Sequence, residues 1–302
     1  MPSYGRRQSK MKTINLGQNS PEWLEFRRNK IGASDAPIIL GVSPFKTSYQ
    51  LYLDKVEGMK QTQNSAMKRG QEMEPEARAA FEKMYEMLYL DTVNIAPLVV
   101  QSEQYDWMIA SLDGIDLDKG VAVEIKCPGS KDHQIAVDGK IPDHYIPQLQ
   151  HQLFVTGLDK IFYFSYRNND TYPVLLEYKA EKAEMDKLIK EELKFLNCIL
   201  TNTPPELKES DYEERFDLEF LQVAMQFAKV KEEIDQKYAE EQKLKDKLIE
   251  LSNNKNCRGG KVKVSQCSRK GAIDYSKIEQ LSNIDLESYR KPATKYTTVG
   301  LC

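Results

Sequence analysis

An aspartate followed, eleven residues later, by a Glu-x-Lys triplet is the part of this sequence with the clearest chemical meaning. Asp113 precedes Glu124, Ile125 and Lys126. In a β-strand alternate residues face the same side, so Glu124 and Lys126 share a face while Ile125 enters the core and leaves its carbonyl near the edge. If the chain turns back between the two segments, two carboxylates and a carbonyl oxygen form a pocket for a hard divalent cation. Lys126 can then hold a water molecule, and this chemistry suits hydrolysis of a phosphodiester.

The same pattern also fits a surface hairpin with one ion pair, because 46 acidic and 43 basic residues produce chance copies of it. Asp116 and Asp118 fit the turn between two strands. The five cysteines are scattered without a Cys-x-x-Cys pair, and the three histidines lack a cysteine pair at zinc spacing. A metal here would therefore be held by oxygen atoms, which indicates Mg²⁺, with Mn²⁺ as a substitute.

Helices dominate the first ninety residues, and short strands follow. Ser20 and Thr47 are expected to cap helices, and Ser34 to cap a short apolar helix at 38–40. Further segments with helical periodicity lie at 67–88, 141–156 and 182–200, and runs rich in β-branched and aromatic residues predict strands at 93–100, 107–112, 121–127, 161–166 and 174–178. The pattern predicts a mixed α/β domain over residues 1–205.

Charge is segregated in the last hundred residues. Residues 206–254 form a long helical segment in which eight of the ten heptad a and d positions between Phe220 and Leu251 are apolar, so it could pair within the chain or between chains. Residues 206–250 carry a net charge of −6 and residues 255–302 one of +6. The basic module at 255–302, with interleaved tyrosines, fits a DNA contact or a role in assembly or stability.

The composition is that of a soluble globular protein, with 302 residues, 40% hydrophobic and 29% charged. The formal charge of −3 argues against a histone-like coat of positive charge. No apolar run reaches 18 residues and no apolar segment follows the basic N-terminus, so we expect neither a membrane span nor a signal peptide. The expected location is the cytoplasm.

Five motifs occur in a fixed order over residues 20–170. They are W-x3-R-x6-S from Trp23 to Ser34, RGQEMEPEA at 69–77, SLDG at 111–114, EIKCP at 124–128 and YIPQLQ at 145–150. Together they resemble the lambda-exonuclease and YqaJ-type branch of the PD-(D/E)xK nuclease superfamily, over about the first 200 residues. The resemblance implies an α/β (α+β) fold with a restriction-endonuclease-like mixed sheet flanked by helices, to which this chain adds the long helix and the basic module.

The resemblance also implies a metal centre. Asp113, Glu124 and the carbonyl of Ile125 would ligate Mg²⁺, and Lys126 would position or activate the water. Glu74 would be an additional metal or water ligand from the preceding helix.

A phosphate site is implied as well. Arg27 and Ser34 would bind the 5′-terminal phosphate of DNA, and the amides at the start of a helix capped by Ser34 would attract the anion. Without the resemblance, Ser34 reads as an N-cap and Arg27 as a surface cation. Arg28 is a rival for the phosphate because it is adjacent, although the spacing favours Arg27.

The YIPQLQ helix carries further polar candidates. Gln148 would orient the nucleophile or the lysine, and Gln150, two residues on, cannot face the metal as well. His144 and His151 are seven residues apart and are expected on a similar face, as polar lining or substrate contacts.

The expected function is that of a metal-dependent deoxyribonuclease, a 5′-to-3′ exonuclease that acts on double-stranded DNA ends in phage-type recombination. The resemblance implies a single-strand annealing recombinase as partner, and the protein could form a homo-oligomer. The alternatives are an endonuclease or opposite-polarity nuclease of the same superfamily, and a non-catalytic DNA-binding or scaffold protein.

Overall fold

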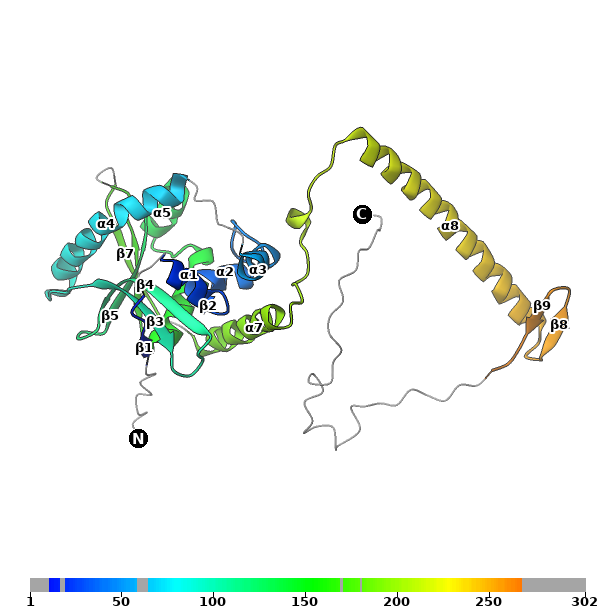
Figure 1. Cartoon of the computed structure of the whole chain (residues 1–302), viewed down its shortest axis with the longest axis horizontal. Coiled ribbons are helices and arrows are strands. Elements are labelled where there is room, and N and C mark those ends of the chain that lie inside the picture. Colours follow the sequence, from blue (N-terminus) through cyan, green and yellow to red (C-terminus); the bar gives the residue numbers. More distant parts are fainter. Residues whose placement is uncertain (1–10, 17–19, 59–64, 169–170, 180, 268–302) are drawn as a thin grey trace, which may run out of the picture. The chain divides into compact units, whose positions relative to one another are not determined.

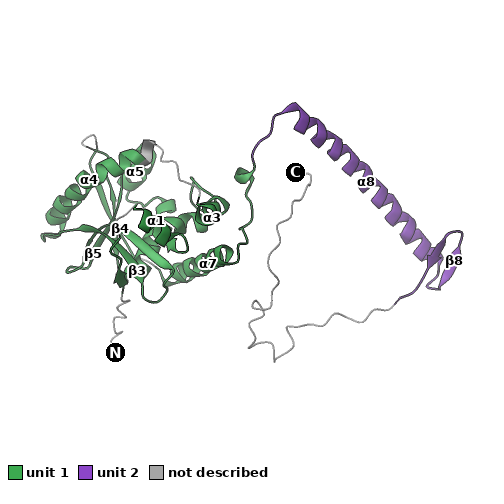
Figure 2. Ribbon diagram, viewed as in Figure 1, with its two compact units in different colours: residues 1–212 green, residues 213–302 purple. Residues whose placement is uncertain are grey.

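The computed structural model describes residues 11–16, 20–58, 65–168, 171–179 and 181–267 (Figure 1). The chain divides into two compact units, Met1–Tyr212 and Glu213–Cys302 (Figure 2). Within the described residues, no helix is both long enough and apolar enough to cross a membrane. The boundaries expected from the sequence at residues 205 and 254 stay predictions.

A mixed sheet forms the centre of the first unit, which confirms the expected fold class. Its strands are β1 (Met11–Thr13), β2 (Ile31–Gly32), β3 (Ala96–Ser102), β4 (Met108–Asp116), β5 (Val121–Lys126), β6 (Ile161–Ser165) and β7 (Val174–Tyr178). The order is β1-β3-β4-β5-β6-β7, with β2 attached to β4 (Figure 1). Only the β5–β6 and β2–β4 pairs are parallel among the described strand pairs.

Most helices of this unit begin within two residues of the expected positions, but the helix expected at 141–156 begins at Ile146 and the helix Ser130–Val137 was not predicted. The helices are α1 (Pro21–Arg27), α2 (Ala36–Ile39), α3 (Ser48–Glu57), α4 (Ser65–Tyr89), α5 (Ser130–Val137), α6 (Ile146–Thr156) and α7 (Lys182–Leu200), with single 3₁₀ turns η1 (Ala33–Asp35), η2 (Asp143–Tyr145) and η3 (Glu209–Asp211). Ser20 and Thr47 cap α1 and α3, because their hydroxyls accept hydrogen bonds from the backbone N–H groups of Trp23 and Gln50.

Ser34 does not cap a helix, so that prediction is wrong. It lies inside η1, where the neighbouring Asp35 side chain accepts a hydrogen bond from the Gly32 N–H at 2.9 Å. The following helix, α2, has four residues. The carboxylate of Asp35 therefore stabilises this turn. The hydroxyl of Ser34 makes no cap contact and is available to another side chain.

Helices α4 and α6 pack against alternate residues of β5, and therefore against opposite faces of the sheet. Val123 and Ile125 lie in one cluster with Phe81 of α4. Ala122 lies in another cluster with Leu149 of α6. The face that buries Ala122 also receives Glu124 and Lys126, so α6 is the helix that meets them.

Strand β4 changes its partner along one edge. Its first residues, Met108 and Ile109, pair with β2, whereas the pairing with β5 begins at Gly114, opposite Val123. Asp113 directly precedes this point and lies where β4 and β5 have separated. The exchange therefore leaves room for a carboxylate between two strands that are otherwise hydrogen-bonded to each other.

A buried pair links α6 to α7. His151 Nδ1 lies 2.7 Å from Glu192 Oε1, its Nε2 lies 2.9 Å from the Ile109 carbonyl, and neither side chain is exposed. Because a carbonyl only accepts, Nε2 carries a proton. The expectation that His151 contacts substrate is therefore wrong, since the apolar neighbours of α6 bury its ring.

The second unit contains α8 (Leu218–Leu251), capped by Asp217, and a hairpin of β8 (Cys257–Gly259) and β9 (Val262–Val264). The long helix confirms the helical segment expected within residues 206–254. Gly260 in the hairpin turn has φ of +57°, a conformation that glycine adopts without strain. The rest of the basic module, with its tyrosines, lies outside the described residues.

Candidate active site

Glu124 is the centre of a polar cluster between β5 and α6. Its side chain is buried, and Oε1 accepts hydrogen bonds from Gln148 Nε2, at 2.5 Å, and from Lys126 Nζ. Oε2 accepts a further bond from Gln152 Nε2. Gln148 and Gln152 lie one helical turn apart on α6, so both amides face the strand. The expected common face of Glu124 and Lys126 is confirmed.

Asp113 meets this cluster from β4. Its Oδ2 accepts a hydrogen bond from the Ile125 N–H at 2.8 Å, in place of the missing β4–β5 ladder bond. The N–H and C=O of one strand residue point to the same side. The next carbonyl, that of Lys126, points the other way and accepts from Tyr166 N at 2.8 Å. The Ile125 carbonyl is therefore directed to the side of Asp113, as the sequence predicts.

The two carboxylates are electrostatically coupled. Burial and the nearby charge of Glu124 raise the pKa of Asp113 well above its ordinary value, although Lys126 acts in the opposite direction. Burial alone would lower the pKa of Lys126, but the charges of Glu124 and Asp113 raise it above its usual range. Lys126 is therefore an ammonium at neutral pH and acts as a hydrogen-bond donor.

Glu74 reaches the same site from α4, where it is held by an arginine. Arg78 Nη2 donates to Glu74 Oε1 at 2.5 Å, and Arg78 Nε donates to the Asp113 carbonyl at 3.0 Å. The charge of Glu74 also contributes to the raised pKa of Asp113. Arg78 was missed in the sequence, since nothing local marks a contact to a strand 35 residues away.

An aromatic ring lies beside the lysine. The Lys126 ammonium is 5.2 Å from the ring centroid of Tyr145, which in turn lies 5.7 Å from the ring of Tyr163. A cation over a ring face is attracted to it. Tyr145 therefore helps to fix the direction of Lys126, together with Glu124.

The donor set fits a hard divalent cation. Mg²⁺ is commonly held by one or two carboxylates and keeps several waters, and Asp113, Glu124 and the Ile125 carbonyl supply oxygen atoms of this kind. No group of three His, Cys, Asp or Glu side chains arranged to hold a metal occurs among the residues that the structure describes. Glu74, the third carboxylate near this site, is engaged by Arg78.

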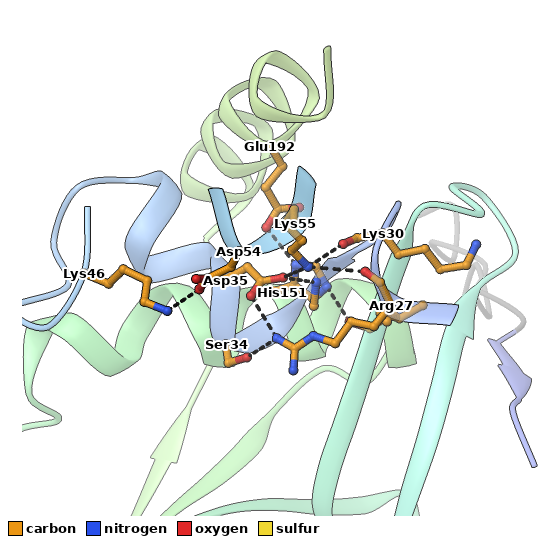
Figure 3. Close-up of polar contacts among 11 residues, drawn as sticks. Arg27, Lys30, Ser34, Asp35, Lys46, Asp54, Lys55, His151 and Glu192 are labelled. Atoms are coloured by element: carbon orange, nitrogen blue, oxygen red, sulfur yellow. Dashed lines mark hydrogen bonds and ion pairs between the residues drawn. The ribbon is translucent and has the colours of Figure 1, made fainter. Parts of the chain in front are cut away.

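A second polar cluster lies at the start of α2 (Figure 3). Arg27 Nη2 donates to Ser34 Oγ at 2.9 Å and to Asp35 Oδ1 at 2.8 Å. Ser34 is exposed and the Arg27 side chain is 32% exposed, so an anion can reach both. Arg28 instead pairs with Glu25 at 3.3 Å. The structure therefore joins Arg27, and not its rival, to Ser34.

Helix α6 is the common support of both clusters. It carries Gln148 on the face toward Glu124, and it buries Leu149 and Leu153 against Ala33, the neighbour of Ser34. Gln150 points elsewhere and donates to Glu184 at 2.6 Å. The choice of Gln148 over Gln150 stays a prediction for catalysis, and the contact to Glu124 supports it.

Replacing Gln152 with leucine is expected to lower the free energy of unfolding by about 1–3 kcal/mol, because Glu124 Oε2 loses its donor in a buried position. Denaturant unfolding measures the change. Gln134 is the matched control, since its amide donates to Asp138 on the exposed surface of α5 and its replacement by leucine should have little effect. Equal stability of the Gln152→Leu variant and the wild type would show that Glu124 does not depend on this amide.

Comparison with known proteins agrees with the geometry. Residues 22–159, which hold both clusters, match the YqaJ-like viral recombinase domain. This segment of the chain is therefore similar to the YqaJ-like viral recombinase family, and we call it the YqaJ-like domain. The uncharacterized protein YqaJ of Bacillus subtilis strain 168 is 28% identical over 206 residues, which cover 67% of this chain and 63% of that protein. The chain thus spans less than two thirds of that relative.

Solved structures also resemble the YqaJ-like domain. The alkaline exonuclease LHK-Exo from Laribacter hongkongensis matches with a TM-score of 0.51 and 25% identity, over 61% of this chain and 94% of that one. LHK-Exo in complex with dAMP matches with the same TM-score and 24% identity. The family match and this likeness support a nuclease of the YqaJ type.

Proposed function

We propose that the YqaJ-like domain is a Mg²⁺-dependent exodeoxyribonuclease that degrades double-stranded DNA from a 5′ end. The observation that carries the proposal is that one helix, α6, packs against two polar clusters, through Gln148 at Glu124 and through Leu149 and Leu153 beside Ala33. One site has the oxygen donors and the ammonium for phosphodiester hydrolysis, and the other has an arginine and a serine open to an anion. An enzyme that holds a terminal phosphate beside its cleavage site works from that end.

We assign each residue of the site a separate role in the reaction. Asp113, Glu124 and the Ile125 carbonyl hold the metal, which supplies Lewis-acid activation of water and neutralises charge on the leaving oxygen. Lys126 donates a hydrogen bond to the attacking water or to a phosphate oxygen, and Gln148 keeps Glu124 and the lysine in place. Glu74, held by Arg78, orients a water at the same centre.

The biological setting follows from the family. A YqaJ-like nuclease that resects one strand exposes single-stranded DNA, which is the substrate of a single-strand annealing protein. We therefore place this chain in phage-type recombination beside such a partner. The dAMP bound by LHK-Exo is consistent with a site that receives a nucleoside monophosphate.

End-labelled duplexes test polarity and mode together. A 5′ label should be released as mononucleotide before a 3′ label on the same duplex, and a closed circular duplex should remain intact. Early release of the 3′ label would establish the opposite polarity, and cutting of the circle would establish an endonuclease. Binding without cleavage in Mg²⁺ or Mn²⁺ would favour a non-catalytic scaffold.

Arg27→Ala and Ser34→Ala are expected to reduce the advantage of a 5′-phosphorylated end over a 5′-hydroxyl end. Loss of hydrogen bonds to a charged phosphate corresponds to about 10- to 100-fold for Arg27, and less for Ser34. Rates on unphosphorylated ends should change little. Single-turnover rates on matched duplexes measure the ratio, and equal slowing on both ends would indicate a structural role instead.

A further inference from the structure

A buried carboxylate lies directly behind the arginine of the phosphate site (Figure 3). Asp35 is 3% exposed, and both of its oxygen atoms are occupied. Oδ1 accepts from Arg27 Nη2 at 2.8 Å, and Oδ2 accepts from the Gly32 N–H at 2.9 Å and from Lys55 Nζ at 2.7 Å. Nη2 of Arg27 is therefore directed toward Asp35 and Ser34 at once.

Lys55 fixes this carboxylate from α3. It is 7% exposed, and besides Asp35 it donates to the carbonyls of Lys30 at 2.8 Å and Arg27 at 3.4 Å. An ammonium has three donors, and here all three point into the protein. Lys55 thus ties the end of α1 to the turn that holds Ser34, although nothing in the sequence links a lysine to a turn 20 residues earlier.

The charges of the cluster do not balance. Two cations, Arg27 and Lys55, share the single carboxylate of Asp35, so the group carries one excess positive charge. Lys55 is enclosed, whereas Arg27 remains partly exposed. The excess charge is therefore available to an external anion only through the guanidinium of Arg27.

Gly32 leaves space for that guanidinium. A Cβ at residue 32 would lie 3.3 Å from Arg27 Nη2, which is closer than most Cβ contacts, and 3.5 Å from its Nε, which is an ordinary contact. The planar group therefore rests against bare backbone on one side and is hydrogen-bonded to Asp35 on another. Its orientation is set before any ligand arrives.

We infer that Asp35 and Lys55 are positioning residues that hold Arg27 in register with Ser34 and thereby set the preference for 5′-phosphorylated DNA ends. The inference rests on the proposed function. It assigns the selectivity to a buried ion pair that does not touch the phosphate. A fixed orientation of Arg27 before the DNA binds contributes to binding. Its loss should therefore raise KM for phosphorylated ends and leave kcat for hydroxyl ends unchanged.

The test uses the full chain with Lys55→Met, which keeps the length of the side chain and removes its charge. Steady-state kinetics on 5′-phosphate and 5′-hydroxyl duplexes should show at least a fivefold loss of phosphate preference, expressed in KM. The matched control is Lys46→Met, because Lys46 pairs with Asp54, which is on α3 like Lys55, and Figure 3 shows Lys46 directed to Asp54 and not to Arg27. The control should keep the wild-type ratio.

A second variant guards against misfolding. Asp35→Asn combined with Lys55→Met removes both members of the buried pair, which is tolerated better than leaving one charge alone. It too should lose the phosphate preference. If the wild type cleaves 5′-phosphate and 5′-hydroxyl ends at the same rate, both the proposed phosphate site and this inference are overturned. If the wild type prefers phosphorylated ends and a folded Lys55→Met or double variant keeps the same preference, only this inference is overturned.

An independent observation concerns α8. No residue of this 34-residue helix is buried, yet it carries a continuous apolar seam. The seam residues, at heptad a and d positions, are Phe220, Val223, Phe227, Val230, Ile234, Leu244, Leu248 and Leu251, each 37–64% exposed. Two charged residues, Lys237 and Glu241, interrupt the seam at consecutive positions.

These two charges select an orientation for a second copy of the helix. In an antiparallel pair with Lys237 facing Glu241 of the other copy, an a position meets a d position in every layer. Ile234 then faces Leu244, and the remaining layers pair Val230 with Leu248 and Phe227 with Leu251. A parallel pair in register would place Lys237 against itself and Glu241 against itself, which is repulsive in both layers.

Charges beside the seam do not decide the orientation. In the antiparallel register Glu233 lies opposite Lys247 of the other copy, which is favourable, and Lys231 lies opposite Lys245, which is unfavourable. These side chains are solvated and several are paired within their own helix, as Lys231 is with Asp235. Exposed pairs of this kind contribute little. We infer that α8 pairs antiparallel with α8 of a second copy of this chain.

Charge reversal in the full chain tests the pairing. Lys237→Glu or Glu241→Lys should halve the mass measured by light scattering, because each creates two like-charged layers. The double reversal should restore the wild-type mass, and so should mixing the two single variants. Lys243→Glu is the matched control, since it makes the same charge change outside the seam. If the Lys237→Glu variant has the same mass as the wild type, and circular dichroism shows the same helix content, the pairing is overturned.

Discussion

Replacing Lys126 with methionine is expected to slow DNA cleavage by about 10²- to 10⁴-fold, the range over which a positioned proton donor contributes to catalysis. The ammonium contacts Glu124 and lies over Tyr145, so its direction is fixed before substrate binds. Asp113→Asn and Glu124→Gln should cause losses at least as large, because each removes a negative oxygen from the pocket and keeps the shape of the side chain. Single-turnover cleavage of a saturating duplex measures the effect on chemistry.

The fold should survive these changes, although Lys126→Met should lower the Tm. Without the ammonium, two buried carboxylates face each other unpaired, and an uncompensated buried charge is costly. Cleavage should therefore be assayed well below the Tm of the variant. Binding of the duplex in Ca²⁺ tests whether the DNA-binding surface of the variant is intact. Asp118→Asn is the matched control, because Asp118 is an exposed carboxylate in the turn of the same β4–β5 hairpin. A folded Lys126→Met variant that cleaves at the wild-type rate would refute this assignment.

The alternation within β5 and the turn after β4 were sufficient to predict the centre of the site. Glu124 and Lys126 share a face because a strand has a period of two residues, and Asp113 lies beside them because the chain turns back at 117–120. Gln152 could also have been found, since it lies one helical turn from Gln148. Local periodicity thus accounts for the shared face of Glu124 and Lys126 and for the turn that brings Asp113 beside them.

Contacts between distant segments could not be predicted in this way. Arg78 reaches Asp113 across 35 residues, and Lys55 reaches Asp35 across 20. The error at Ser34 has a related cause. A serine before a short apolar run is a good cap by local rules, but the longer carboxylate of Asp35 forms the backbone contact of this turn because Lys55 and Arg27 stabilise its charge. Tertiary electrostatics therefore overrode the local preference.

His151 shows the same limit in the core. Its spacing from His144 predicts a shared face, yet His151 is fully buried against Glu192 of α7, whereas His144 lies 3.5 Å from Asp132. The spacing argument fails because His144 lies in the 3₁₀ turn η2, before α6 begins at Ile146, so the two histidines do not share one helix. The contact of His151 with Glu192 of α7, 41 residues later in the chain, could not be predicted from this spacing.

Removal of divalent metal is expected to abolish cleavage completely, and addition of Mg²⁺ or Mn²⁺ to restore it. The physical reason is the pair of carboxylates at Asp113 and Glu124. Desolvation and the nearby charge of Glu124 raise the pKa of Asp113, and a divalent cation would neutralise both carboxylates together. Binding to the folded state should also stabilise the protein, by about 2.7 kcal/mol at a metal concentration of 100 Kd. Thermal unfolding with and without Mg²⁺ therefore reports on the site without any DNA present.

Comparison of three variants identifies the ligands. Asp113→Asn should remove the stabilisation by metal, since one of the two carboxylates becomes a neutral amide. Glu74→Gln should weaken metal binding less than Asp113→Asn does, because Arg78 already engages that carboxylate. Asp118→Asn should leave the metal-induced rise in Tm unchanged. Equal stabilisation of the wild type and the Asp113→Asn variant by Mg²⁺ would mean that the cation binds elsewhere, and the oxygen pocket between β4 and β5 would then lose its role as the metal centre.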